Sequence, residues 1–145
     1  MKNIQIAIDG PSGAGKSTMA KLVSKELGIL YLDTGAMYRT VALKALKTGV
    51  DTKDSAALSE MVADIVIDVI YHDEQQKVYL DGEDVTGEIR TPEVTVGSSD
   101  VAVVPEVRKK MVELQQEIAK AKSVVMDGRD IGTHVLPNAD VKIFL

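Results

Sequence analysis

One short stretch near the N-terminus constrains the fold of this chain more than any other feature. Residues 10–17 read Gly-Pro-Ser-Gly-Ala-Gly-Lys-Ser and satisfy the pattern G-x-x-x-x-G-K-[ST]. The pattern follows an apolar run, Ile4 to Ile8, and opens a helical spacing of apolar residues that extends to Leu27. Glycines let such a loop curl so that backbone N–H groups and the helix dipole face an anion. We therefore predict a phosphate-binding loop, called here the phosphate loop, between a buried strand and a helix.

The composition indicates that phosphate binding depends on placed groups and not on bulk charge. The 145 residues carry 17 Lys and Arg against 22 Asp and Glu, so the formal charge is −5, which argues against a general nucleic-acid-binding surface. The absence of Cys excludes disulfides, thiolate catalysis and Cys-based metal sites. No apolar run approaches the ~18 residues that a membrane span needs. The length suits one domain.

The first third of the sequence predicts a parallel α/β unit. A second short strand is expected at Ile29 to Leu32, after a helix that Gly28 ends. A second helix is expected at Ala36 to Lys47, closed by Gly49. Strand, helix, strand and helix within about 50 residues indicate a right-handed parallel arrangement.

The middle of the chain predicts a small antiparallel insert. A helix is expected at Ser55 to Ala63, capped by Ser55 or Asp54. Two strands follow at 67–71 and 77–80, and Asp81-Gly82 signals a further turn.

The last third returns to the pattern of the first. Val107, Met111, Leu114, Ile118 and Ala121 repeat at helical spacing after Pro105, which predicts a helix packed on the core by this face. Strands are expected at Ser123 to Met126 and at Val141 to Leu145, the latter as a buried strand.

Three expected strands end in an aspartate. These are Asp9, Asp33 and Asp127, and the carboxyl ends of parallel strands border the ligand crevice of an open sheet. Carboxylates beside phosphates repel them unless a cation intervenes. We therefore expect Mg²⁺ at this edge, ligated by the Ser17 hydroxyl, with Asp33 and Asp127 as the candidate carboxylates. Asp9 is expected to brace the loop instead.

Arginine is sparse in this chain, which makes its positions informative. Two of the four arginines, Arg39 and Arg129, lie just beyond Asp33 and Asp127. Guanidinium is a rigid bidentate clamp for phosphate. These two residues are therefore expected to hold a second, acceptor phosphate.

Four segments together resemble a known family. IAIDGPSGAGKST, YLDTGAMYR, DGEDVTGEIRTPEV and MDGRDIGT occur in this order, and the similarity extends from Ile4 to Leu145. The family is bacterial cytidylate kinase, a P-loop nucleoside monophosphate kinase. The resemblance implies an α/β fold, with a P-loop-type parallel sheet flanked by helices and a small antiparallel monophosphate-binding insert. It also implies transfer of the γ-phosphoryl group of ATP to CMP or dCMP, with Mg²⁺.

The resemblance implies roles for residues outside the phosphate loop as well as within it. The residues that it assigns to the donor phosphates are Gly10, Pro11, Ser12, Gly13, Ala14, Gly15, Lys16, Ser17 and Thr18. Those that it assigns to the acceptor are Tyr38 and Arg39 (sugar and phosphate), Arg129 (phosphate), and Ser99, Arg108 and Asp130 (the cytosine edge). Lys16, Arg39 and Arg129 are the expected catalytic residues.

The resemblance also divides the chain. Residues 1–64 and 105–145 are expected to form the P-loop core, and residues 65–104 the monophosphate-binding insert. The family continues beyond the strand at 141–145 with a lid and a last core strand that would flank the strand of the phosphate loop. We therefore expect a C-terminally truncated chain that is marginally stable and prone to aggregate.

Alternatives to this enzyme remain open from the sequence alone. They are a chain that binds nucleotide without catalysis, a kinase for another small acceptor, and an interaction protein with a vestigial loop. The expected partners are the small molecules CMP and dCMP, with no nucleic acid and no membrane. We expect a monomer in the cytoplasm that acts in pyrimidine nucleotide metabolism.

Overall fold

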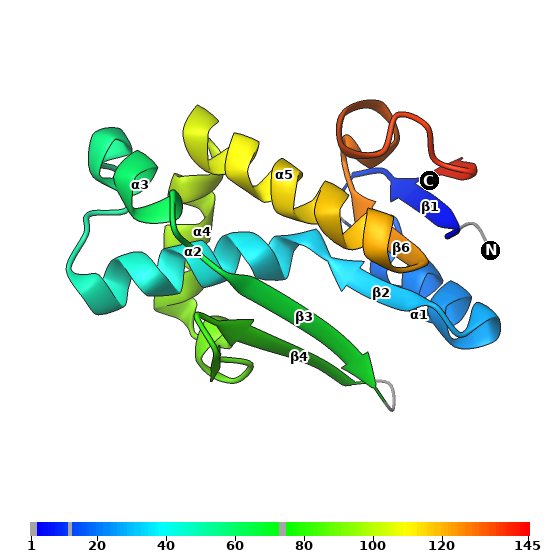
Figure 1. The fold of residues 1–145 in the computed structure, drawn as a ribbon, viewed down its shortest axis with the longest axis horizontal. Helices are drawn as coiled ribbons and strands as arrows, with labels where there is room; N and C mark the ends of the chain where they lie inside the picture. Colours follow the sequence, from blue (N-terminus) through cyan, green and yellow to red (C-terminus); the bar gives the residue numbers. More distant parts are fainter. Residues whose placement is uncertain (1–2, 12, 73–74) are drawn as a thin grey trace. The chain divides into compact units, whose positions relative to one another are not determined.

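The computed structural model describes residues 3–11, 13–72 and 75–145 (Figure 1). These residues form two compact units. The first holds the described residues up to Thr34, Gln75 and residues 114–145, and the second holds 35–72 and 76–113. This division follows spatial clustering, so the boundaries expected for a monophosphate-binding insert at 65–104 stay a prediction.

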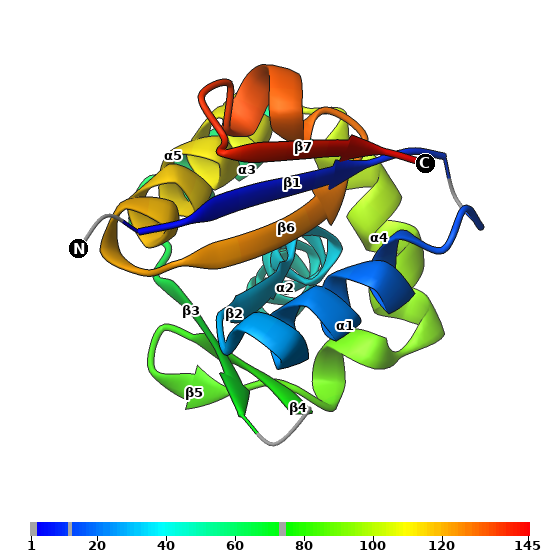
Figure 2. The same ribbon diagram turned by 90° about the vertical axis from the view of Figure 1, so that its right-hand side faces the viewer.

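The first unit is built on a parallel sheet of four strands. They are β1 (Gln5–Asp9), β2 (Leu30–Asp33), β6 (Val124–Gly128) and β7 (Val141–Phe144), in the spatial order β2-β6-β1-β7 (Figure 2). The apolar run in β1 is fully covered, because both faces of this inner strand are packed. The predicted parallel α/β class is therefore confirmed.

Helix α1 (Lys16–Leu27) follows the phosphate loop and packs against β1, β2 and β6. It ends where the sequence indicates, because Gly28 adopts a left-handed conformation (φ 65°) and its N–H donates to the Ser24 carbonyl. A single π-helical turn, η2 (Ile131–Val135), contacts β1 and β6. Figure 2 shows α1 and η2 on opposite sides of the sheet.

Strand β7 departs from two expectations. It was predicted to be buried, but Val141 is 45% and Phe144 79% exposed, because β7 pairs only with β1 and lies at the edge of the sheet. A strand beyond residue 145 was also expected to flank the strand of the phosphate loop. That expectation is wrong, since β6 and β7 already occupy both sides of β1.

The second unit contains four helical segments. They are α2 (Thr34–Thr48, from its second residue), α3 (Ser55–Val62), α4 (Pro92–Ala102) and the first half of α5 (Pro105–Ala121). Asp54 caps α3, since its carboxylate accepts a hydrogen bond from Ala57 N–H. Both α2 and α3 lie within two residues of the predicted bounds.

Three short strands form the small sheet of the second unit, in the order β3-β4-β5. They are β3 (Ile67–His72), β4 (Gln75–Leu80) and β5 (Glu83–Asp84), followed by one 3₁₀ turn, η1 (Glu88–Arg90). Strands β4 and β5 are antiparallel, and Asp81 and Gly82 between them have φ angles of 48° and 88°. This is the two-residue turn that the Asp-Gly pair predicts.

In helices α4 and α5 the structure differs from what the spacing of apolar residues in the sequence predicted. The sequence interpretation did not include α4, although Thr91 and Pro92 are a helix-start signal and the Thr91 hydroxyl accepts from Val94 N–H. In α5, Val107 and Met111 are buried as expected, but the buried row continues through Gln115 and Ala119. None of the helices within the described ranges is long and apolar enough to span a membrane.

Helix α4 packs closely through Gly97. A Cβ atom at this position would lie 3.2 Å from both Ala42 Cβ and Thr52 Cγ2. We expect Gly97→Val to lower the free energy of unfolding by about 1–3 kcal/mol, because the added methyl groups overpack this contact. Urea denaturation would measure the change. Thr95→Val, at an exposed position of the same helix, is the control and should shift stability by less than about 0.5 kcal/mol; equal losses in both variants would contradict the prediction.

Candidate functional site

The phosphate loop connects β1 to α1 at the carboxyl end of the sheet. Gly13 and Gly15 have φ angles of 81° and 88°, which L side chains rarely adopt. A Cβ atom at either position would meet nothing within 4 Å, so the space above these glycines is open. Of the nine residues assigned to donor phosphates, Ser12 lies outside the described residues.

The N-terminus of α1 presents backbone N–H groups at this loop that have no partner within the helix. Gly15 is the N-cap residue, and no side chain of the described residues caps it. The first intrahelical hydrogen bond is donated by Met19 N–H to the Gly15 carbonyl at 3.0 Å. The backbone N–H groups of Lys16, Ser17 and Thr18 precede it and have no partner within the helix. An oxyanion is the group that such an end binds best.

Lys16 lies across its own loop. Its Nζ donates to the Gly10 carbonyl at 2.6 Å and to the Pro11 carbonyl at 3.3 Å. These contacts hold the ammonium over the loop, where a phosphate oxygen can replace a carbonyl oxygen as its partner.

Gly10 is constrained by its neighbours as well as by the loop. Its N–H donates to the Gly128 carbonyl at 3.1 Å, and a Cβ atom on it would lie 2.8 Å from the Leu145 carbonyl oxygen. Leu145 N–H in turn donates to the Asp9 carbonyl at 2.8 Å. The start of the loop is therefore held between the ends of β6 and β7.

The register of the parallel strands decides which aspartates come together. Asp33 is the direct partner of Asp127, and Asp127 is the partner of Ile8. Residues in one such row point to the same face of the sheet, so Asp33 and Asp127 form a pair. Asp9 is one residue further along β1, and its side chain points to the opposite face.

Asp9 therefore has a structural role. Its two carboxylate oxygens accept hydrogen bonds from the backbone N–H groups of Ile131 and Gly132, at 2.7 and 2.8 Å. Asp9 was expected to brace the phosphate loop, but the segment that its carboxylate holds is η2.

The pKa of the Asp127 carboxyl is perturbed by its surroundings. Its side chain is 9% exposed, and burial together with the negative charge of Asp33 raises the pKa of its carboxyl to about 6. The Tyr31 hydroxyl, which donates to Asp127 Oδ1 at 3.1 Å, and the nearby Lys16 ammonium act in the opposite direction. Two carboxylates held this close favour a cation between them and an anionic ligand.

The residues expected to hold a metal fit this role as a partial ligand set. Across residues 3–11, 13–72 and 75–145, no group of three or more His, Asp or Glu side chains lies close enough to hold a metal on its own. The Asp33–Asp127 pair and the exposed Ser17 hydroxyl are all in the first unit. Mg²⁺ commonly completes such a set with phosphate oxygens and water.

The residues expected to bind the acceptor are divided between the two units. Arg129 and Asp130 lie in the first unit, in the turn between β6 and η2. Tyr38 and Arg39 lie on α2, Ser99 on α4 and Arg108 on the first half of α5, all in the second unit. Their roles in acceptor binding stay predictions.

Three residues at the sheet edge were not singled out from the sequence. Tyr31 donates to the Asp127 carboxylate, and the buried Thr34 hydroxyl donates to the Asp127 carbonyl at 2.9 Å. A Cβ atom on Gly128 would lie 2.8 Å from Ile131 Cδ1. Tyr31 and Thr34 both belong to the segment YLDTGAMYR, in which the sequence indicated roles only for Asp33, Tyr38 and Arg39.

Comparison with known proteins identifies the family of the chain. Residues 6–145 match the family model described as cytidylate kinase.

The chain belongs to the cytidylate kinase family.

Curated relatives named "Cytidylate kinase" include those of Caldicellulosiruptor bescii (56% identical over 145 residues, covering 100% of this chain and 64% of the relative) and Pelotomaculum thermopropionicum (59% over 141 residues, 97% and 62%). The relative from Bacillus pumilus is 55% identical over 144 residues, covering 99% of this chain and 64% of the relative. The chain thus spans less than two thirds of the length of these relatives.

The buried carboxylate of Asp127 predicts a cost in stability that one substitution removes. Because the pKa of Asp127 is raised to about 6, the folded state binds more protons than the unfolded state between about pH 4 and 6, and stability falls as the pH rises through this window. We expect Asp127→Asn to abolish this fall and to raise the free energy of unfolding at pH 7.5 by up to about 3 kcal/mol. The measurement is urea denaturation between pH 4 and 8.

The control for this variant is Asp64→Asn, which removes a carboxylate at an exposed position. It should keep the wild-type pH profile. An Asp127→Asn variant with a wild-type pH profile, or with lower stability at pH 7.5, would show that the buried charge is not the origin of the effect.

Proposed function

We propose that the full-length protein transfers the γ-phosphoryl group of ATP to CMP or dCMP and releases CDP or dCDP. The observation that carries the proposal is the match of residues 6–145 to the cytidylate kinase family, at 51–59% identity to relatives of that name. The open phosphate loop and the uncapped end of α1 support it, because they suit an anionic donor.

The donor side of the reaction depends on the first unit. The N–H groups at the start of α1 would bind phosphate oxygens, and Lys16 would exchange its bonds to the Gly10 and Pro11 carbonyls for bonds to the outer phosphates. Phosphoryl transfer needs little covalent chemistry from the protein. The rate therefore depends on the positioning of the two substrates and on neutralisation of the phosphate charge.

Ser17, Asp33 and Asp127 are the residues proposed to hold Mg²⁺. When bound, the metal supplies charge neutralisation at the donor phosphates. The protein's own contribution is to keep the two carboxylates in one register row, and Tyr31 and Thr34 fix Asp127 from its side chain and its carbonyl.

The acceptor side depends on arginines and on polar groups for the base. Arg39 and Arg129 are proposed to bind the acceptor phosphate, and Tyr38 the acceptor nucleotide beside it. Ser99, Arg108 and Asp130 together offer a hydroxyl, a guanidinium and a carboxylate, which match the exocyclic amine, ring nitrogen and carbonyl of cytosine. We further propose a cytoplasmic monomer in pyrimidine nucleotide metabolism, acting on small molecules and not on nucleic acid or membranes.

A second candidate function concerns this chain in isolation. The curated relatives are longer, since 145 residues cover 62–64% of those named above. The 145-residue chain would then bind nucleotide phosphates at residues 10–17 without transferring them. A kinase for another small acceptor is the remaining alternative, and the assay below separates all three.

We expect a coupled ADP-release assay to show turnover with CMP and dCMP and much less with UMP or AMP. The assay would use the 145-residue chain beside the Caldicellulosiruptor bescii relative as the positive control. Turnover with AMP or UMP while CMP is inert would overturn the substrate assignment. ATP binding by calorimetry without turnover would support the second candidate for this chain.

Lys16→Ala should lower kcat by about 10²–10³, because it removes a cation placed where charge develops in the reaction. Lys21→Ala is the matched control, since Lys21 is an exposed lysine on the same helix. Where the chain binds but does not turn over, the same pair is compared by its affinity for ATP. Equal kinetics, or equal ATP affinity, in the two variants would contradict the role of Lys16.

A further inference from the structure

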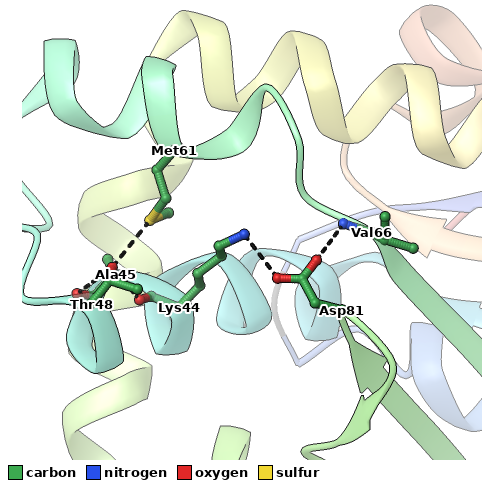
Figure 3. Close-up of polar contacts among 6 residues, drawn as sticks. All are labelled: Lys44, Ala45, Thr48, Met61, Val66 and Asp81. Atoms are coloured by element: carbon green, nitrogen blue, oxygen red, sulfur yellow. Dashed lines mark hydrogen bonds and ion pairs between the residues drawn. The ribbon is translucent and has the colours of Figure 1, made fainter.

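Asp81 adopts an unusual backbone conformation in the second unit. Its φ angle of 48° makes it the one non-glycine residue with positive φ in the part of the chain that the structure describes. Asn and Asp tolerate this region better than most residues, and Gly82 follows with a φ angle of 88°. The strained turn aims the Asp81 carboxylate back toward the base of the small sheet (Figure 3).

Asp81 closes the base of the small sheet onto the start of β3. Its backbone N–H donates to the Val66 carbonyl at 2.8 Å, and its Oδ1 accepts from Val66 N–H at 2.9 Å. The residue before β3 and the residue after β4 are therefore joined by two hydrogen bonds. The hairpin cannot open at this end unless both bonds break.

The other carboxylate oxygen fastens the sheet to helix α2. Lys44 Nζ donates to Asp81 Oδ2 at 2.8 Å, and the Lys44 side chain is 19% exposed against 43% for Asp81 (Figure 3). Partial burial works against the charged form of Asp81, but hydrogen bonds from Lys44 and Val66 outweigh it and hold the pKa of this carboxyl below its usual range. One turn further along α2, Lys47 pairs with Glu88 at 2.8 Å.

Helix α2 carries Arg39 as well as this contact. Arg39 lies five residues before Lys44, which is about 7.5 Å along a helix axis. The helix between them is buried at Thr40, Val41, Ala42 and Leu43. A displacement of Lys44 is therefore transmitted to the proposed acceptor-phosphate residue through packed, regular helix.

We propose that Lys44 and Asp81 are positioning residues for acceptor binding, because they fasten the β3–β5 sheet to the helix that presents Arg39. This proposal rests on the proposed function for the role of Arg39. The pair fixes the arrangement of sheet and helix before the acceptor arrives, so less conformational freedom is lost on binding. It touches neither the donor nor the reacting atoms.

Two substitutions break the contact in different ways. Lys44→Met removes the ammonium and keeps the length of the stem. Asp81→Asn removes the charge but keeps an acceptor for Val66 N–H and tolerates the positive φ angle. Lys44→Arg conserves the ion pair. Lys53→Met, at an exposed position of the same unit, removes the same charge elsewhere and is the matched control.

The primary measurement is CMP affinity by calorimetry on the 145-residue chain, followed by KM and kcat where the chain turns over. We expect Lys44→Met and Asp81→Asn each to weaken CMP binding about three- to fivefold, which is the scale of one partly exposed ion pair. The double variant should be no weaker than the weaker single variant. Lys44→Arg and Lys53→Met should bind as the wild type, and ATP affinity and kcat should be unchanged in all variants.

The outcomes separate this inference from the proposed function. If the chain binds CMP without turnover, catalysis by this chain is contradicted. The Lys44–Asp81 pair is still tested in that case, through the CMP affinity of the variants. Unchanged CMP affinity in Asp81→Asn, with only a lower melting temperature, would show a purely structural contact and overturn the inference. Additive losses in the double variant, or an equal loss in Lys53→Met, would also overturn it, and so would a wild-type chain that does not bind CMP.

Discussion

The parallel register of β2, β6 and β1 is the constraint on which the rest of the site depends. It places Asp33 beside Asp127 and Asp127 beside Ile8, one residue before the strand ends and the phosphate loop begins. It also turns Asp9 to the other face, where its carboxylate holds η2. A shift of one residue in the β1–β6 pairing would exchange the faces of Asp9 and Ile8, so the register of the sheet decides which aspartate holds η2.

The same edge combines features that oppose folding. The Asp33–Asp127 pair places negative charge beside an open glycine loop and a helix end that no side chain of the described residues caps. Tyr31, Thr34 and Lys16 offset part of that cost with hydrogen bonds and charge. The arrangement suits the ligand proposed above, which carries both a cation and phosphate oxygens. The second unit, by contrast, satisfies its exposed turn at Asp81 entirely from within.

Local signals predicted the first unit well, because glycines, caps and a continuous apolar run each have one structural meaning there. The phosphate loop and α1 with Gly28 at its end follow from residue type alone, and so does the Asp-Gly turn of the second unit. Helix α4 was missed because Val96 and Val103 are exposed and Gly97 is buried, which obscures the apolar period. The apolar sequence of β7 suits an inner strand and an edge strand equally, and only the strand order distinguishes them. The face to which Asp9 points likewise requires the register.

Gly10 meets two structural requirements that are usually met by different residues. The phosphate loop needs a small residue where the chain leaves β1, and the Leu145 carbonyl oxygen lies where a side chain on Gly10 would be. Substitutions of Gly10 would therefore be disfavoured for two separate reasons. One is the proposed contact of the loop with a ligand, and the other is the close approach of Leu145 at the edge of the sheet. The edge of the sheet and the phosphate loop meet closely at Gly10, so sequence changes in β7 can alter the phosphate loop without any residue of the loop being replaced.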